Sequence, residues 1–153
     1  MKQFNKICIG CDHAALELKD KLVAFLKDKN IYVHDFGTND PDISVNYPDF
    51  AMRVSKSVVQ KESDCGILIC GTGLGMSMAA NRFAGIRAAL CNDIFSAKMC
   101  RQHNNANILV MGGRIIGDVL AKEIVQTFLE TSFDGDRHAD RLNIFNHLGE
   151  MIN

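Results

Sequence analysis

The chain has 153 residues, of which 47% are hydrophobic and 23% charged, and its formal net charge is -1. These values are ordinary for a globular protein and predict a single domain over residues 1–153. Without a basic excess the chain lacks the charge that binds nucleic-acid phosphates. It has no apolar run of the roughly 18–20 residues that span a membrane, and its N-terminus does not resemble a signal peptide. We therefore expect a cytoplasmic protein that binds neither nucleic acid nor a membrane.

In the first part of the chain the sequence predicts two strands, each followed by a helix. Ile7–Gly10 is a short apolar run typical of a buried strand, and Ala14–Lys29 repeats apolar residues at helical spacing. Ile31–Phe36 is the second expected strand. After a polar loop, Pro48 stands at the first position of a helix that runs to about Lys61, where a missing amide hydrogen costs nothing.

The rest of the chain continues the same alternation. Cys65–Cys70 is the most hydrophobic short run, so we expect a central strand there. The elements expected after it are, in order, a helix over 74–82, a strand at Ile86–Cys91, a helix at Ile94–Gln102, a strand at Asn107–Met111, a helix at Ile116–Leu129 and a last helix over about 137–152.

Five strands alternating with helices predict an α/β fold, specifically a doubly wound, Rossmann-like three-layer sandwich with a five-stranded parallel sheet. We expect the first strand to pair with Cys65–Cys70. In such sheets ligands bind beyond the carboxyl ends of the strands. That rule selects the loops at Cys11–His13, Gly37–Tyr47, Gly71–Gly75 and Asn92–Phe95.

The six cysteines do not indicate a metal or disulfide framework. Most of them lie in or beside apolar runs, where a reduced cysteine packs as a small hydrophobic residue. Cys8 and Cys11 form a CxxC pair, but no second CxxC or suitably spaced histidine pair follows. Zinc binding and thiol redox chemistry are therefore not favoured for this pair.

The segment Cys70–Gly75 is rich in glycine and joins a strand to a helix. Successive backbone amides in such a turn, together with a helix N-terminus, bind an anion. A P-loop is excluded, because no Lys-Ser/Thr pair follows the glycines. A dinucleotide-binding turn stays open, with Asp93 as the ribose-binding acid, although the third glycine comes one residue early. A tight turn without a ligand is the structural alternative.

Cys70 at the end of the strand favours a catalytic interpretation. The glycine amides and the helix N-terminus would stabilise a thiolate and lower the pKa of this thiol. Abstraction of a proton next to a carbonyl requires a base whose pKa lies near the operating pH. The neighbouring amides could hold the resulting enediolate oxyanion. We therefore interpret this segment as a proton-transfer site.

Three further groups of polar residues have both a functional and a structural interpretation. Asp12 and His13 follow the first strand at the ligand-binding edge, but aspartate is also a common helix N-cap. Arg137 and Arg141 stand one helical turn apart and could converge on one phosphate, or form a solvated charged turn. His103–Asn105 lies between a helix and a strand, where asparagine often ends the helix.

Taken together, these segments resemble ribose-5-phosphate isomerases of the B type, a family that also includes allose-6-phosphate and galactose-6-phosphate isomerases. The resemblance covers nearly the whole chain, in the family's order and spacing. The segments that carry it are GCDHAA, YPD, ICGTGLGMSMAANRFAGIRAAL, SAKMCRQHNNANIL, the pair Gly113-Arg114 and DRHADR.

The resemblance implies a role for each candidate residue. In the aldose–ketose chemistry it implies Cys70 as the base between C1 and C2, Thr72 and the amides of Gly71, Gly73 and Gly75 as the groups that hold the enediolate, and Asp12 as a ligand of the sugar hydroxyls. For the rest of the substrate it implies His103 with Asn104 in ring opening, His13, Arg137 and Arg141 as a phosphate clamp, and Tyr47 and Arg114 in the same pocket.

The resemblance also implies the partners of the chain. It implies no metal or organic cofactor, a small phosphorylated sugar as substrate, and a homodimer or tetramer. The last helix would pack at the dimer interface, and His103 and the two arginines would come from the neighbouring subunit. The base, the histidine and both arginines are all present in this chain, which favours a homodimer.

The favoured reaction interconverts D-ribose 5-phosphate and D-ribulose 5-phosphate, a step of the pentose phosphate pathway, through an enediolate. The alternatives are an isomerase of a hexose 6-phosphate (allose or galactose) and a non-catalytic nucleotide- or phosphate-binding module.

Overall fold

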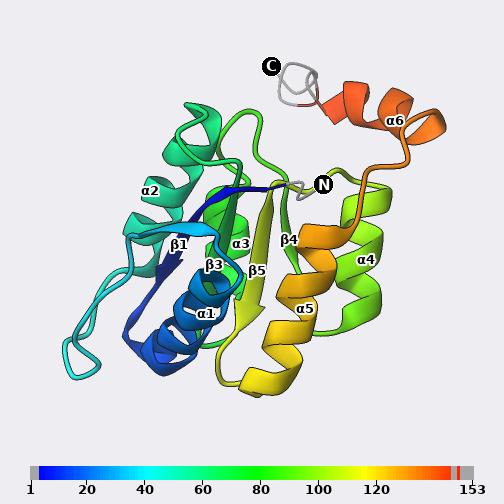
Figure 1. Cartoon of the computed structure of the whole chain (residues 1–153). Coiled ribbons are helices and arrows are strands. Elements are labelled where there is room, and N and C mark those ends of the chain that lie inside the picture. Colours follow the sequence, from blue (N-terminus) through cyan, green and yellow to red (C-terminus); the bar gives the residue numbers. More distant parts are fainter. Residues whose placement is uncertain (1–3, 146–147, 149–153) are drawn as a thin grey trace.

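The chain folds around a five-stranded sheet in which every strand is parallel to its neighbours (Figure 1). This computed structural model describes residues 4–145 and 148. The strands are β1 (Lys6–Cys11), β2 (Tyr32–Asp35), β3 (Cys65–Cys70), β4 (Ala88–Leu90) and β5 (Ile108–Gly112), arranged in the order β2-β1-β3-β5-β4. The predicted doubly wound α/β sheet and the predicted pairing of the first strand with Cys65–Cys70 are confirmed.

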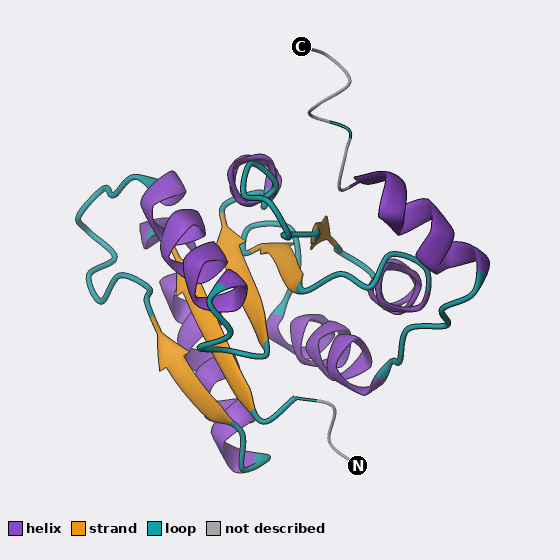
Figure 2. Cartoon of the chain, turned by 90° about the horizontal axis from the view of Figure 1, so that it is seen from above, coloured by secondary structure: helices purple, strands orange, loops and turns teal. Residues whose placement is uncertain are grey.

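Helices cover both faces of the sheet, so the molecule has three layers, as predicted (Figure 2). One face carries a short 3-10 turn η1 (His13–Ala15), α1 (Leu16–Asp28), α4 (Ile94–Gln102) and α5 (Asp118–Glu130); the other carries α2 (Tyr47–Val59) and α3 (Leu74–Ala80). The last helix, α6 (Arg137–Phe145), stands outside these layers (Figure 1). None of the helices in the described part of the chain is long and apolar enough to cross a membrane.

The alternation of side chains along a strand explains how one apolar run serves two cores. All six residues of β3 are buried; Ile67 and Ile69 pack in the cluster with α1, α4 and α5, whereas Leu68 and Cys70 pack in the cluster with α2 and α3. Burying one such aliphatic side chain contributes about 1.5–3 kcal/mol. The same alternation separates the CxxC pair, because Cys8 and Cys11 lie in different clusters, so the two thiols cannot chelate one metal ion.

Most boundaries differ from the prediction by one or two residues, and in β4 and α5 local turns compete with the regular elements. β4 is shorter than the predicted Ile86–Cys91, because the amide of Ile86 closes a turn onto the carbonyl of Phe83. α5 begins at Asp118 rather than at Ile116, since the amide of Ile116 bonds to the carbonyl of Gly112 in a turn after β5.

The last helix is also shorter than the predicted 137–152. α6 ends at Phe145 and Leu148 lies in a turn, whereas 146–147 and 149–152 lie outside the described residues.

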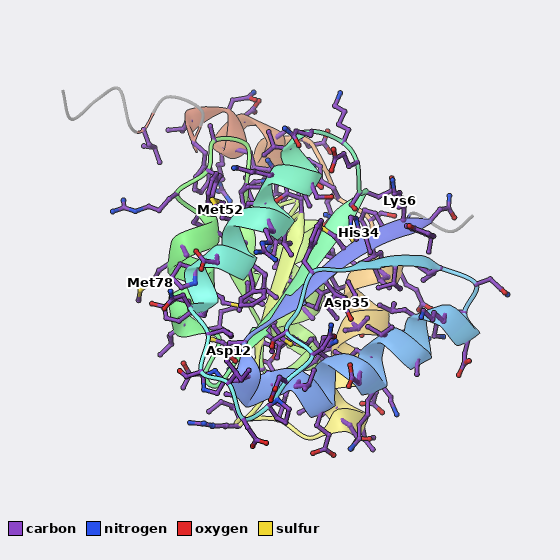
Figure 3. The ribbon with its side chains drawn as sticks, turned by 90° about the vertical axis from the view of Figure 1, so that its left-hand side faces the viewer. Lys6, Asp12, His34, Asp35, Met52 and Met78 are labelled. Atoms are coloured by element: carbon purple, nitrogen blue, oxygen red, sulfur yellow. The ribbon has the colours of Figure 1, made fainter. Side chains whose placement is uncertain are left out.

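The parallel topology places the two ends of each helix at opposite edges of the sheet. Every helix that follows a strand starts at the carboxyl edge and returns to the amino edge, where the next strand begins. The end of α4 and all of α6, which follows α5, therefore lie at the amino edge. Figure 3 shows Lys6 and Asp12 at opposite ends of β1, with α6 on the side of Lys6.

Candidate active site

The carboxyl ends of β1 and β3 form the centre of the candidate site. The chain leaves β1 toward β2 on one side, whereas β3 leads to the strands on the other side, so the order reverses between these two neighbours. Such a switch point leaves a crevice in which ligands bind. Here the amide of Asp12 donates to the carbonyl of Ile69 at 3.3 Å, which ties the two loops together.

The glycine loop after β3 brings a backbone amide onto the thiol of Cys70. Gly73 has φ +80°, and its amide donates to Sγ of Cys70 at 3.2 Å. A Cβ at Gly73 would lie 2.4 Å from Cδ1 of Leu90 and 3.0 Å from the carbonyl of Met111. Only glycine combines the left-handed backbone with this close approach. The buried thiol therefore lies beside an amide donor at the start of α3.

Two predicted pocket residues cover this loop. The side chain of Arg114 lies over Gly71, close enough that a Cβ there would be 3.6 Å from Cδ of the arginine. This contact arises because β5 sits next to β3 in the sheet. The ring of Tyr47 lies over Gly75, where a Cβ would come within 2.5 Å of Cζ. Thr72 is exposed at the tip of the loop.

Asp12 and His13 follow β1 at the same edge of the sheet. Asp12 is buried, and burial raises the pKa of its carboxyl; its hydrogen bond from the amide of Ala14 at 3.0 Å and the nearby charges of His13 and Arg114 oppose that rise. Asp12 therefore also acts as the N-cap of the first turn. Nδ1 of His13 accepts from the amide of Val45 at 3.3 Å, so the neutral ring carries its proton on Nε2 and can donate from there.

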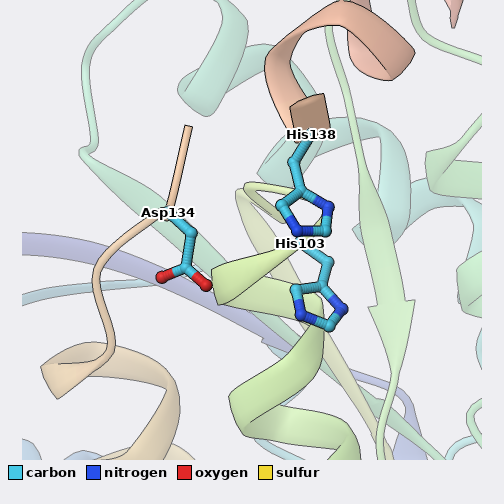
Figure 4. Close-up of side chains that lie close together, drawn as sticks. All are labelled: His103, Asp134 and His138. Carbon is cyan, nitrogen blue, oxygen red and sulfur yellow. The ribbon is translucent and has the colours of Figure 1, made fainter. Parts of the chain in front are cut away.

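The other predicted residues lie at the opposite edge of the sheet. His103 follows α4 directly, Asn104 comes next, and Arg137 and Arg141 are on α6. The ring of His103 stacks on that of His138, with centroids 4.3 Å apart and planes 5° apart (Figure 4). One chain therefore does not bring these residues to its own Cys70.

The paired histidines and Asp134 form a cluster whose candidate ligand atoms lie within 4.8 Å of one another (Figure 4). Its geometry does not suit a metal ion, because parallel stacked rings direct their lone pairs side by side rather than toward one point. Burial and the positive charges of His103, Arg137 and Arg141 lower the pKa of His138. The carboxylate of Asp134 opposes this shift.

Comparisons with known proteins place this arrangement in a family. A model of the ribose/galactose isomerase family matches residues 7–145. The chain belongs to this family. Ribose-5-phosphate isomerase B of Escherichia coli (strain K12) is 43% identical over 149 residues, which cover 97% of this chain and 99% of that protein.

Two solved structures extend the match to the fold. A ribose 5-phosphate isomerase from Thermotoga maritima is 55% identical, with a TM-score of 0.91 over 94% of this chain and 98% of that one. Ribose-5-phosphate isomerase B from Mycoplasma genitalium, solved with bound ribulose-5-phosphate, is 40% identical, with a TM-score of 0.90 over 95% of this chain and 96% of that one. As a member of this family, the chain is a sugar-phosphate aldose–ketose isomerase.

Asp93, which the dinucleotide alternative needs, has a structural role in this fold. The carboxylate of Asp93, the expected ribose-binding acid of that alternative, accepts from the amide of Ser96 at 2.7 Å and from its hydroxyl at 2.6 Å. Asp93 is thus the N-cap of α4, which accounts for an aspartate at this position.

The sequence analysis assigned no role to four residues that lie near His103 or bond to the segment after it. Asp134 precedes the arginine pair and His138 lies between its two members, and this closeness in sequence was the available signal. Arg87 and Arg101, which bond to the segment after α4, gave no sequence signal. Their partners are mainly backbone carbonyls, which any sequence supplies.

A cavity of about 710 Å³ lies between α6 and the connection from α3 to β4. Asn104 and Phe145 line it, whereas none of its lining residues belongs to the group around Cys70. The hydrogen-bonded thiol and amide lie at the carboxyl edge, away from this cavity.

Proposed function

We propose that this isomerase interconverts D-ribose 5-phosphate and D-ribulose 5-phosphate, with Cys70 as the base. The observation that carries the proposal is the amide of Gly73 at 3.2 Å from Sγ of Cys70, at the switch point of the sheet. Isomerisation moves a proton between C2 and C1 and turns the carbonyl oxygen into an enediolate oxygen. The site needs a base and oxyanion donors side by side, which this loop offers.

The groups around the thiol would bind the reacting end of the sugar. The amides of Gly71, Gly73 and Gly75 and the hydroxyl of Thr72 would donate to the enediolate oxygens. Asp12 would accept from a sugar hydroxyl. Its burial at the crevice favours this role, because a substrate hydroxyl would give the buried carboxylate a second hydrogen-bond donor.

The groups at the amino edge would bind the rest of the substrate. His103, with Asn104, would transfer the proton that opens the furanose ring. Arg137 and Arg141 would hold the phosphate together with the Nε2 proton of His13. The two arginines are cationic and stand one helical turn apart on α6, which favours a phosphate dianion as their ligand.

The two groups would meet in a homodimer. Within one chain they lie at opposite edges of the sheet, so a complete site needs the carboxyl edge of one subunit and the amino edge of the other. Apolar side chains are available for such an interface. Leu74 and Met78 on α3, and Ile144 and Phe145 on α6, are all exposed in the single chain.

The relatives support a pentose phosphate as substrate, because they are named for ribose 5-phosphate and one structure holds ribulose-5-phosphate. A substrate panel tests this directly. We expect ribose 5-phosphate to give a higher kcat/KM than allose 6-phosphate or galactose 6-phosphate. Preference for either hexose phosphate would refute the pentose assignment while leaving the isomerase chemistry in place.

The experiment on the mechanism replaces the base. Cys70→Ala should abolish ketose formation while sugar-phosphate binding stays within about tenfold, because the thiol acts mainly in the transition state. Cys65→Ala, at the other end of the same strand, is the matched control and should keep its activity. If Cys70→Ala isomerises within about an order of magnitude of the parent rate, Cys70 is not the base.

A further inference from the structure

The segment His103–Ala106, which links α4 to β5, is held by two arginines from different parts of the chain. It contains Asn105 at φ +43°, a left-handed conformation that asparagine adopts more readily than most residues with a side chain. Backbone bonds hold part of this segment, since the amides of Asn105 and Ala106 donate to the carbonyls of Arg101 and Cys100, but its own carbonyls need donors from the surroundings. Arg87 and Arg101 supply them.

Arg87 approaches this segment from the start of β4. Its Nε donates to the carbonyls of Asn104 and Asn105, at 3.1 and 2.9 Å. Its own amide donates to Oδ1 of Asn107 at 2.8 Å, so its backbone is tied to the same link. The side chain is half-buried, and burial lowers the pKa of its guanidinium. Both carbonyls would lose their bonds to Arg87 if its guanidinium were removed.

Arg101 approaches from inside the protein. It is 2% exposed, and its Cζ lies 5.1 and 5.4 Å from the ring centroids of Phe4 and Phe128. Its Nη1 donates to Oδ1 of Asn105 at 3.0 Å and to the carbonyl of Ala106. Two guanidinium groups thus bracket the residues that follow His103.

Arg101 also reaches the segment that leads to His138. Its Nε donates to the carbonyl of Thr131 at 3.4 Å, just after α5. Three residues later, the amide of Asp134 donates to the carbonyl of Gln102 at 3.0 Å. Both partners of the histidine stack are therefore anchored through the same end of α4. A change in either anchor would move one ring relative to the other.

We propose that Arg87 and Arg101 are positioning residues that hold His103 stacked on His138 and so set the proton-transfer geometry of His103. This proposal rests on the proposed role of His103 in ring opening. Neither arginine needs to touch the substrate. A misplacement of about 1 Å in a reacting group can cost on the order of a hundredfold in rate.

The first test observes the rings without substrate. Arg87 is the residue to change, because replacement of the buried Arg101 would leave buried carbonyls without a donor and could unfold the chain. Arg87→Met keeps a long side chain and removes the donors. Arg82→Met is the matched control, because Arg82 is exposed in the same connection and its side chain has no hydrogen bond or ion pair within the described residues.

Labelling the Cε1 carbon of the five histidines gives one NMR signal for each. We expect Arg87→Met to shift the signals of His103 and His138 and to change their titration, because the stack loosens. The signal of His34, on β2 at the far edge of the sheet, should not move. If the two ring signals are the same in Arg87→Met and in the parent protein, the proposal is wrong.

The second test measures coupling to His103. On ribose 5-phosphate, Arg87→Met should lower kcat about tenfold or more. It should change KM less than about threefold, because the residues proposed to bind the phosphate stay in place. In a His103→Asn background the same change should cost less than about twofold, since an effect that passes through His103 cannot be lost twice. Equal losses in both backgrounds would overturn the proposal.

The two tests also separate this inference from the proposed function. A parent protein that turns over none of the sugar phosphates would refute the proposed function, whereas the ring signals would still show whether Arg87 holds the stack.

Discussion

Replacing Gly73 by alanine should damage both the stability of the protein and its chemistry, because this glycine is required for two separate reasons. Its φ of +80° is unfavourable for an alanine, and the added Cβ would collide with its surroundings. Gly85 is a matched control. It has nearly the same φ, +82°, but a Cβ there would meet nothing within 4 Å.

The expected magnitudes follow from these contacts. The left-handed backbone costs an alanine about 1–2 kcal/mol at either position. At Gly73 the Cβ would also lie 2.4 Å from Leu90 and 3.0 Å from the backbone of Met111, and overpacking of this kind costs about 1–3 kcal/mol more. Leu90 can turn aside, but the backbone of Met111 in β5 cannot. We therefore expect the free energy of unfolding to fall by about 2–5 kcal/mol in Gly73→Ala and by about 1–2 kcal/mol in Gly85→Ala.

Urea denaturation followed by circular dichroism measures this difference, because the chain has no tryptophan to report unfolding by fluorescence. The protein concentration must be the same for each variant, since association contributes to the stability of a dimer. Isomerase assays at a temperature where both variants are folded should show a loss of about a hundredfold or more in Gly73→Ala and little change in Gly85→Ala. Equal stability and equal activity of the two variants would refute the account of the glycine loop.

Two further predictions concern charged residues at opposite edges of the sheet. Burial raises the pKa of Asp12, so its ionised form destabilises the folded state above that pKa, and the cost disappears as the pH falls through it. Denaturation should show Asp12→Asn to be more stable than the parent at pH about 7 but not at pH about 4, with weaker substrate binding; an equal gain at both pH values would contradict this. Arg137→Ala should raise KM, with a loss on the order of 1.5–3 kcal/mol in binding, as for one charge-assisted hydrogen bond. An unchanged KM in steady-state kinetics would remove Arg137 from the phosphate clamp.

The sequence predicts the strands themselves, but not the order in which they lie in the sheet. Strong apolar runs such as Cys65–Cys70 define strands regardless of context, and both ends of that strand were predicted correctly. The position of β5 between β3 and β4 could not be predicted, because several crossover orders satisfy the same pattern of strands and helices. That position decides which side chain covers the glycine loop, namely Arg114.

The same limit applies to the candidate site. Cys70 and its glycines form one continuous segment, so their proximity followed from the sequence. The hydrogen bond from Val45 to His13 and the bonds from Arg87 and Arg101 join distant segments. No local sequence pattern predicts such contacts. In most of them one partner is a backbone group, which every residue has.

Mixing two impaired variants, assayed at a substrate concentration below the KM of Arg141→Ala, tests most directly whether each site is shared between two chains. Cys70→Ala lacks the base at the carboxyl edge and Arg141→Ala lacks an arginine at the amino edge. After subunit exchange, each hybrid dimer would contain one site with both defects and one intact site, and so should recover about half the activity of the parent dimer. Native mass spectrometry with one subunit isotope-labelled would establish the exchange. Recovery of activity is the result we predict; no recovery in a mixture that demonstrably contains hybrids would mean that each site is built from a single chain.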